Sequence, residues 1–270
     1  MVGRSGWLKL VILATLGVIA LGPILLLSVW SITYSWFWPD LLPGSFSLRA
    51  WRYAFSSVAR LDVALLTSLG IGSIVAAISV LIGWPAARVI ALADFPGKRL
   101  LLFLLLLPVL APPLASTMGM HAVFLRYEVA DTVAGVIMAH LVPCVPYAVL
   151  VLSGSFSRLE TGLEDQARTL GADVYQVWRY VTLPQLMPGV MVAAAFAFLI
   201  SWSQYLPTLI IGGGSVQTLP LSLVAFQRSG DDSIAAVLSL IFLAPAVAVL
   251  LLAGRQMLPD VAADHLIQKR

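Results

Sequence analysis

Six long stretches of this chain contain no charged residue, and they constrain the fold more than any other feature. They cover residues 10–39, 63–87, 100–125, 132–157, 180–227 and 233–254. Each stretch can hold the roughly 20 apolar residues with which a helix crosses about 30 Å of hydrocarbon. Only 11% of the residues are charged, and the mean hydropathy is +0.96, whereas about a quarter of a soluble domain is charged. The sequence therefore predicts a membrane protein.

Helices are the expected spanning elements, because backbone amides in lipid must find partners within their own segment. The short alternating segments of a transmembrane β-barrel are absent. The fifth stretch is interrupted at Gly212-Gly213-Gly214, so it is predicted to hold one span. We predict an all-α protein with one transmembrane domain, residues 1–270, and a loop between spans four and five at about 158–186. The six spans are expected at about 10–31, 63–84, 100–121, 132–153, 189–211 and 233–254.

The distribution of Lys and Arg predicts the orientation of these spans. An even number of spans places both termini on one side, and eleven of the sixteen basic residues then fall on that side. Basic residues are enriched in cytoplasmic loops, so both termini and the loop at 158–186 are predicted to be cytoplasmic. This topology explains the net charge of +3, and no nucleic-acid partner is expected. The single Cys144 lies within the fourth span, and we expect neither a disulfide nor a metal site.

The loop between spans four and five carries an unusual share of the charges, including Glu164, Asp165, Arg168, Asp173 and Arg179. Its apolar residues recur at helical spacing. These residues are Leu163, Ala167, Leu170, Val174, Val177 and Val181. Glu164 precedes Arg168 by four residues, which predicts an ion pair on a helix.

A glycine lies in the middle of this pattern. Gly171 suits either a turn between two short helices or the close approach of another backbone, and Asp173 suits the N-cap of a second short helix. Leu183-Pro184 is expected to end that helix, and Pro188-Gly189 to begin span five.

Three interpretations of the loop differ in what its charges do. A membrane-surface anchor would require a basic polar face, whereas acids outnumber basic residues around Glu164 and Asp165. A loop that packs only against its own bundle is a second possibility. A docking element for a soluble cytoplasmic partner fits best, because a short helix framed by charges sets both contact and orientation.

The residues Glu164, Ala167, Gly171 and Leu183-Pro184 follow the pattern E-x-x-A-x-x-x-G with a later L-P. This pattern resembles the cytoplasmic signature of the permease subunits of binding-protein-dependent ABC importers of the type I fold. The six-span layout extends the resemblance over essentially the whole chain. One departure is that Asp165-Gln166 replaces the usual small residue after the glutamate.

The resemblance implies that the loop contains a coupling helix seated in a groove of a separate ATP-binding subunit. The residues it assigns to coupling are Glu164, Ala167, Arg168, Gly171, Asp173, Leu183 and Pro184. ATP and Mg would be bound by that partner, because the chain lacks G-x-x-x-x-G-K-[ST]; the chain itself is then not an enzyme and holds no cofactor. The other implied partners are a second permease, identical or homologous, and an extracytoplasmic substrate-binding protein. The implied location is the bacterial cytoplasmic (inner) membrane.

A polar cluster in span five is the candidate translocation pathway, because polar groups in lipid are functional candidates. It comprises Ser201, Trp202, Ser203, Gln204 and Tyr205. Helix–helix hydrogen bonding with an interfacial aromatic belt explains the same residues equally well. His140 in span four is predicted to be packed and hydrogen-bonded.

The stretch that follows span five bears on the substrate. Gly212–Gly214 and Thr218-Leu219-Pro220 resemble the branch of these permeases that serves polyamines, thiamine, ferric iron, sulfate or molybdate. A small polar or charged solute is thus expected rather than a sugar.

Two other classes of protein are weighed against the permease. An ion-coupled secondary transporter would carry carboxylates inside the membrane, but all thirteen acidic residues lie outside the six predicted spans. A membrane metalloprotease would need H-E-x-x-H, which His121, His140 and His265 do not form. The secondary transporter is the remaining alternative. A requirement for ATP hydrolysis by another subunit would distinguish the permease from it.

Overall fold

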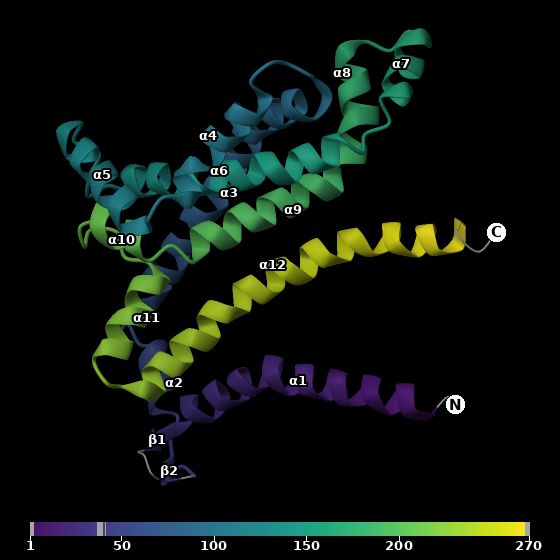
Figure 1. The fold of residues 1–270 in the computed structure, drawn as a ribbon. Coiled ribbons are helices and arrows are strands. Elements are labelled where there is room, and N and C mark those ends of the chain that lie inside the picture. The colour runs from purple at the N-terminus through teal and green to yellow at the C-terminus, as the bar shows by residue number, and fades with distance from the viewer. Residues whose placement is uncertain (1–2, 37–39, 41, 268–270) are drawn as a thin grey trace. The chain divides into compact units, whose positions relative to one another are not determined.

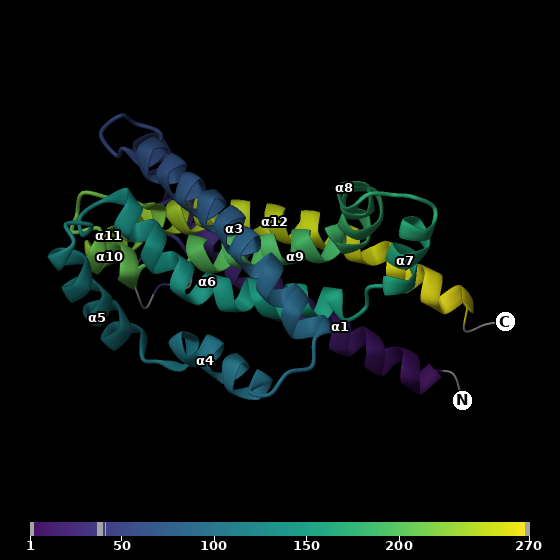
Figure 2. The same ribbon diagram turned by 90° about the horizontal axis from the view of Figure 1, so that it is seen from above.

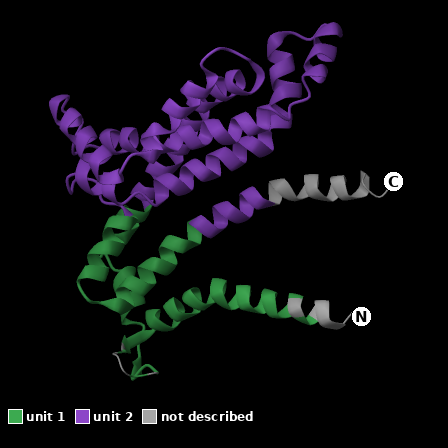
Figure 3. Ribbon diagram, in the orientation of Figure 1, with its two compact units in different colours: residues 1–65, 219–245 green, residues 66–218, 246–270 purple. Residues whose placement is uncertain are grey.

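The computed structural model describes the backbone of residues 3–36, 40 and 42–267, and the side chains of most of them. The chain forms two compact units (Figure 3), unit 1 from residues 1–65 and 219–245 and unit 2 from residues 66–218 and 246–270. Helices α3 (Leu61–Leu92) and α12 (Asp232–Ile267) contribute to both units. The single domain predicted over residues 1–270 stays a prediction, and part of that range lies outside the described residues.

The described helices confirm an all-α membrane protein with five or six candidate spans. Five helices are long and apolar enough to cross a bilayer. They are Lys9–Ser31, Leu61–Leu92, Val133–Phe156, Val174–Trp202 and Asp232–Gly254. The orientation stays a prediction; the side chains of four residues counted for it, Arg4, Arg255, Lys269 and Arg270, lie outside the described part.

The predicted bounds of span three, about 100–121, are wrong, because no single helix covers them. The segment folds as α4 (Lys98–Leu110) and α5 (Pro113–Arg126), which are bent by 93° at the break. Ala111 is extended, with φ −71° and ψ 144°, as expected for a residue before proline. Pro112 and Pro113 have no N–H to continue the helical ladder, so α5 begins anew with a proline in its first turn.

The predicted bounds of span five, 189–211, are also wrong. The spanning helix runs from Val174 through Trp202, and a separate short helix, α10 (Leu206–Ile211), follows it. Leu183-Pro184 does not end a helix, because the π-helical turn η1 (Trp178–Thr182) joins α8 (Val174–Val177) to α9 (Leu183–Trp202). In that wider turn the Leu183 N–H donates to the carbonyl of Trp178, five residues back, and Pro184 then occupies the first turn of α9.

Unit 1 contains α1 (Gly3–Ser31), a small antiparallel pair of strands, α2 (Arg49–Ala54) and α11 (Leu219–Arg228). The strands, β1 (Thr33–Ser35) and β2 (Ser45–Phe46), add an element that the all-α prediction lacked. The Arg49 guanidinium donates to both carboxylate oxygens of Asp231, at 2.9 and 2.8 Å. The buried Ser233 hydroxyl donates to the Thr33 carbonyl at 2.7 Å, so α12 is joined to the strand segment.

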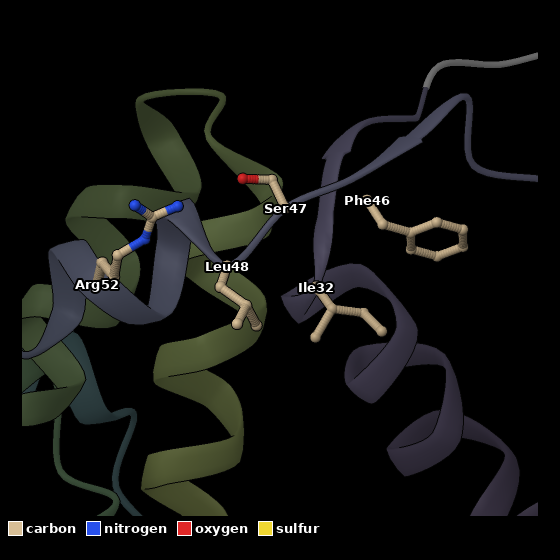
Figure 4. Close-up of a pocket in the computed structure, with 5 residues that line it drawn as sticks. All are labelled: Ile32, Phe46, Ser47, Leu48 and Arg52. Carbon is tan, nitrogen blue, oxygen red and sulfur yellow. The ribbon is translucent and has the colours of Figure 1, made fainter.

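A pocket of about 490 Å³ lies beside these strands (Figure 4). Its lining is mostly apolar, with one guanidinium and one hydroxyl. The lining residues are Ile32, Phe46, Ser47, Leu48 and Arg52.

Unit 2 is organised around α6 (Val133–Phe156) and α9, which lie side by side in Figures 1 and 2. Both views place α7 (Thr161–Thr169) and α8 at one end of this pair, and α5 and α10 at the other. Gly189 of α9 packs directly on Ser155 of α6, where an added Cβ would lie 2.6 Å from the Ser155 Cβ. Small residues allow such close approach of helices in membranes. The apolar core beside this contact consists of Ala87, Ile90, Val149, Leu152, Phe156, Leu186 and Ala193.

The contact between α6 and α9 predicts that one methyl group destabilises the fold. Gly189→Ala should lower the free energy of unfolding by about 1–3 kcal/mol relative to Gly154→Ala, because the new methyl must displace Ser155. Gly154 is the matched control, since nothing lies within 4 Å of a Cβ there and both variants gain the same helix propensity. Thermal unfolding in detergent measures both. Equal stability of the two variants would contradict this description of the helix contact.

Candidate functional site

The charged loop of unit 2 folds as two short helices joined by a tight turn, as the sequence predicts. Helix α7 ends at Thr169, and Gly171 has a left-handed φ of +90°. The Ala172 N–H donates to the Ala167 carbonyl and the Gly171 N–H to the Arg168 carbonyl, both at 3.0 Å. This pair of bonds is a Schellman motif, which requires a left-handed residue at the position of Gly171.

Asp173 begins the second helix, which confirms the predicted N-cap. Its carboxylate accepts from the Gln176 N–H at 2.8 Å, and the Gln176 side chain accepts from the Asp173 N–H at 2.9 Å. Such a capping box satisfies two backbone donors at once. The C-cap at Gly171 and the N-cap at Asp173 therefore reverse the chain within three residues and make the loop locally rigid.

Glu164 points into unit 2, so the predicted ion pair with Arg168 is wrong. The side chain of Glu164 is only 6% exposed. Its Oε2 accepts from Arg88 at 3.1 Å, and its Oε1 accepts from the Thr182 hydroxyl at 2.6 Å. Arg168, one helical turn along, stays exposed and acts on Glu164 only through its charge.

Sequence reasoning missed Arg88 and Thr182 as partners of Glu164. Helix α3 continues to Leu92, eight residues beyond its predicted end, and carries Arg88 to the loop. The charge-free stretch that ends just before Arg88 was the available signal for a longer helix. Nothing local in the sequence indicates that Thr182 faces Glu164.

Glu164 is ionised at neutral pH. Burial raises its pKa, but the hydrogen bonds from Thr182 and Arg88 and the positive charge of Arg88 lower it more, so the pKa lies below its ordinary value of 4.5. The loop is therefore attached to unit 2 through a buried carboxylate.

Large apolar side chains point outward around the turn. Leu170, Val174 and Tyr175 are 88%, 78% and 66% exposed, while Val177 of the predicted apolar stripe is buried. We call Leu170, Gly171, Val174 and Tyr175 the tip residues. A loop that packs only on its own bundle would not expose such groups, so the structure favours docking over self-packing.

The remaining predicted coupling residues lie on the helices that flank the tip. Ala167 is half-buried, and its carbonyl closes the turn. Leu183 is half-buried and Pro184 exposed at the start of α9, inside a continuous helix.

The predicted pathway cluster divides into a buried part and an outward part. Ser201 and Trp202 are buried at the end of α9, and Trp202 stacks on Phe198 with ring centroids 5.7 Å apart. Ser203 is exposed, while Gln204 and Tyr205 are half-buried in the break before α10.

His140 bridges this break, which confirms that it is packed and hydrogen-bonded. Its Nδ1 lies 2.9 Å from the Ser201 hydroxyl and its Nε2 3.0 Å from the Thr208 hydroxyl. The Thr208 hydroxyl donates to the Gln204 carbonyl at 2.8 Å, so its oxygen is left to accept from Nε2–H. The Ser201 hydroxyl then donates to Nδ1. Ser201 thus forms a hydrogen bond between two helices. This is the structural role that the sequence allowed as an alternative to the translocation pathway.

These features define a multi-pass α-helical membrane protein with a rigid, charged helix–turn–helix loop before its penultimate long helix. The family model of the binding-protein-dependent transport system inner membrane component matches residues 79–258, which include Arg88, the whole loop and the His140 bridge. The chain belongs to this family.

Similar proteins are permeases with different solutes in their names. The trehalose transport system permease protein SugB of Mycobacterium tuberculosis is 30% identical over 71% of this chain and 70% of that protein. The molybdenum transport system permease protein ModB of Mycobacterium bovis is 33% identical over 72% of this chain and 78% of that protein. The putative 2-aminoethylphosphonate permease PhnV of Salmonella typhimurium is 27% identical over 77% and 78% of the two chains.

A solved structure agrees in fold. A chain of a bacterial ABC transporter involved in the import of the acidic polysaccharide alginate superposes with a TM-score of 0.70. The match covers 94% of this chain and 98% of that chain at 16% sequence identity.

The lowered pKa of Glu164 predicts how stability depends on pH. A depressed carboxyl pKa stabilises the folded state above the ordinary value of 4.5, and this contribution is lost as the pH falls through the folded-state pKa. The difference in unfolding midpoint between wild type and Glu164→Gln should be constant from about pH 8 to 5 and should shrink below 4.5. Thermal unfolding in detergent across this range measures it. A difference that grows in acid would contradict the charged Glu164.

The His140 bridge predicts different effects of two neighbouring serines. Ser201→Ala leaves a buried imidazole nitrogen without a donor, so it should cost about 1–3 kcal/mol of stability. Ser203→Ala should stay within about 0.5 kcal/mol, because its exposed hydroxyl bonds the Ile200 carbonyl three residues back and, among the described residues, no other helix. Unfolding midpoints in detergent compare the two. A larger loss for Ser203→Ala would show that the bridge is misassigned.

Proposed function

We propose that this chain is the membrane-spanning permease subunit of an ATP-binding cassette importer, with its solute pathway coupled to ATP hydrolysis in a separate subunit. The observation that carries the proposal is the outward apolar tip on a doubly capped loop, Leu170 and Val174 above all. The local caps hold the turn in one conformation, so the tip residues keep their positions. Their exposed apolar groups supply the binding energy of a docking contact.

The partners follow from the family and its chemistry. The ATP-binding subunits dock at the tip residues, and ATP and Mg are bound there rather than in this chain. A second permease, identical or homologous, completes the pathway, and an extracytoplasmic binding protein delivers the solute. Membership of the binding-protein-dependent family supports these partners. It also favours the importer over the alternative function, an ion-coupled secondary transporter.

The location and orientation belong to the same proposal. The protein lies in the bacterial inner membrane, with both termini and the tip on the cytoplasmic side. The family description as an inner membrane component supports the location, and the excess of Lys and Arg on that side supports the orientation.

The substrate proposed is a small polar or charged solute, of the class of polyamines, thiamine, iron or oxyanions. The relatives named for molybdenum and 2-aminoethylphosphonate support an anion, while the relative named for trehalose supports a sugar. Ser203, Gln204 and Tyr205, which lie at the helix break, are the residues proposed to face the solute. Identifying the ligand that co-purifies with the binding protein distinguishes the two classes of solute.

Charge at the tip should prevent the ATP-binding subunit from docking. Leu170→Glu and Val174→Glu should each lower recovery of the ATP-binding subunit with the purified permease by about tenfold or more, because a carboxylate would be desolvated at the contact. Quantitative mass spectrometry of the complex from native membranes measures the recovery.

The control introduces the same charge away from the tip. Val58→Glu changes a side chain that is 76% exposed, close to the 78% of Val174, but belongs to unit 1. It should leave recovery of the ATP-binding subunit at the wild-type level. Full recovery in both tip variants would exclude docking at the tip, and recovery of no ATP-binding subunit with wild type would refute the proposed function.

A further inference from the structure

We infer that the pocket beside the strands of unit 1 is a binding site for one anionic phospholipid, with the phosphate held by Arg52 and Ser47. An acyl chain of this lipid lies along the apolar part of the lining, Ile32, Phe46 and Leu48. The inference goes beyond the proposed function and takes from it only the membrane location and orientation. In that orientation the lipid belongs to the leaflet on the extracytoplasmic side.

The pocket lies at the level where the lipid headgroups begin. Ile32 of its lining directly follows Ser31, the last residue of the candidate span in α1. The indole Nε1–H of Trp51 in α2 donates to the Ser31 hydroxyl at 3.2 Å, so α2 is attached to the end of that span. Trp30 and Trp36 meet edge to face with centroids 5.8 Å apart, and such rings gather at membrane–water interfaces. The pocket is therefore within reach of the headgroups and of the upper part of the acyl chains.

The apolar side chains of the lining are not covered by the protein. Ile32, Phe46 and Leu48 are all exposed. In the view of Figure 4, the side chains of Ile32 and Leu48 point in the direction in which α1 returns into the membrane. Apolar surface exposed to water costs free energy, and grouped exposed side chains mark a site of contact with protein or membrane. An acyl chain lying over these three side chains removes that cost.

The polar part of the lining offers two donors for an anion. Arg49 and Arg52 both lie on α2, but Arg49 is paired with Asp231 at 2.8 Å. The Arg52 guanidinium is exposed and has no ion pair or side-chain hydrogen bond among the described residues. The Ser47 hydroxyl accepts from the Arg49 N–H at 3.1 Å, which leaves its own hydrogen available to donate. Figure 4 shows this hydroxyl turned towards α2, which carries Arg52.

This combination of groups selects an anionic lipid among the possible ligands. A guanidinium beside a hydroxyl is suited to a phosphate, which accepts several charge-assisted hydrogen bonds. A free phosphate would leave the apolar side chains in water, and a zwitterionic lipid would bring its ammonium group close to Arg52. The volume of about 490 Å³ lies within the range of roughly 300–1,000 Å³ of small-ligand sites. Lipid is already present at this level of a membrane protein, so it is favoured over a protein segment that supplies a carboxylate.

The experiment titrates the purified and delipidated permease in detergent with phosphatidylglycerol or with phosphatidylcholine of the same acyl chains. Native mass spectrometry counts the lipids bound. Wild type should bind the first phosphatidylglycerol about tenfold more tightly than phosphatidylcholine, because only the zwitterionic lipid brings a cation to Arg52. Arg52→Gln should weaken phosphatidylglycerol binding by about tenfold, the effect of losing one hydrogen bond to a charged group. It should also remove most of the difference between the two lipids, while Arg52→Lys should lie between Arg52→Gln and wild type.

Two matched controls separate this pocket from the rest of unit 1. Arg60→Gln removes another exposed arginine that has no ion pair among the described residues and does not line the pocket, so it should bind lipid like wild type. Leu48→Gln keeps both donors and should weaken both lipids by a similar factor. Leu42→Gln changes an exposed leucine outside the lining and should weaken neither. All these side chains are exposed, so thermal unfolding in detergent should show wild-type stability throughout.

Three outcomes would overturn the inference. Equal binding of the two lipids to wild type, or an equal loss in Arg52→Gln and Arg60→Gln, would mean that a basic surface attracts anionic lipid without a specific site. Displacement of phosphatidylglycerol by an equal concentration of glycerol phosphate would identify a site for free phosphate. If Arg52→Gln lowers recovery of an extracytoplasmic binding protein and leaves lipid affinity unchanged, the pocket is a protein contact. None of these results bears on recovery of the ATP-binding subunit, the result on which the proposed function depends.

Discussion

A backbone polar group in hydrocarbon must find its partner inside the protein, and the structure of unit 2 depends on this requirement. Long helices satisfy this requirement with their own backbone hydrogen bonds. At each interruption of a helix, the backbone groups need other partners nearby. At the bend between α4 and α5, Ala111 N–H still bonds the Leu107 carbonyl and Ser116 N–H bonds the Pro112 carbonyl. Pro112 and Pro113 have no N–H that would need a partner at this bend, which is why proline is suited to it.

The break between α9 and α10 is satisfied differently. The N–H groups of Ser203 and Gln204 bond back to α9, and the Thr208 hydroxyl bonds the Gln204 carbonyl. His140 then joins both sides of the break through Ser201 and Thr208. The His140 side chain, from the neighbouring helix α6, thus stabilises the break between α9 and α10.

Local signals explain which parts of this structure the sequence could predict. Charge-free stretches predicted spans one, two, four and six, and Gly171 and Asp173 predicted the turn of the loop, because a cap or an apolar run acts within a few residues of itself. The prolines at 108, 112 and 113 favour a kink in this segment, but the size of the bend at Pro112 depends on what packs beside it. The continuation of the helix through Pro184 was missed, since the sequence offers no rule for a π-helical turn.

Contacts between distant residues account for the rest. Arg88 and Glu164 are separated by 76 positions, and His140 and Ser201 by 61. Glu164 has Arg168 four residues away on its own helix, so local reasoning favours a pair that the fold does not make. Glu164 pairs with Arg88 rather than with Arg168 because α7 turns this side chain towards the bundle. The packing of α7 on the bundle sets that orientation.

Helix α9 connects these two distant contacts. Thr182, bound to Glu164, immediately precedes it, and Ser201, bound to His140, lies at its other end. Its 20 residues extend over about 30 Å, close to the thickness of the hydrocarbon. Gly189 packs on Ser155 with no space for a methyl group, so α9 lies in close contact with α6 near its middle. Under the proposed function, α9 is therefore the element that connects the loop to the break at Ser203–Tyr205, and the polar residues proposed to face the solute lie at that end of it.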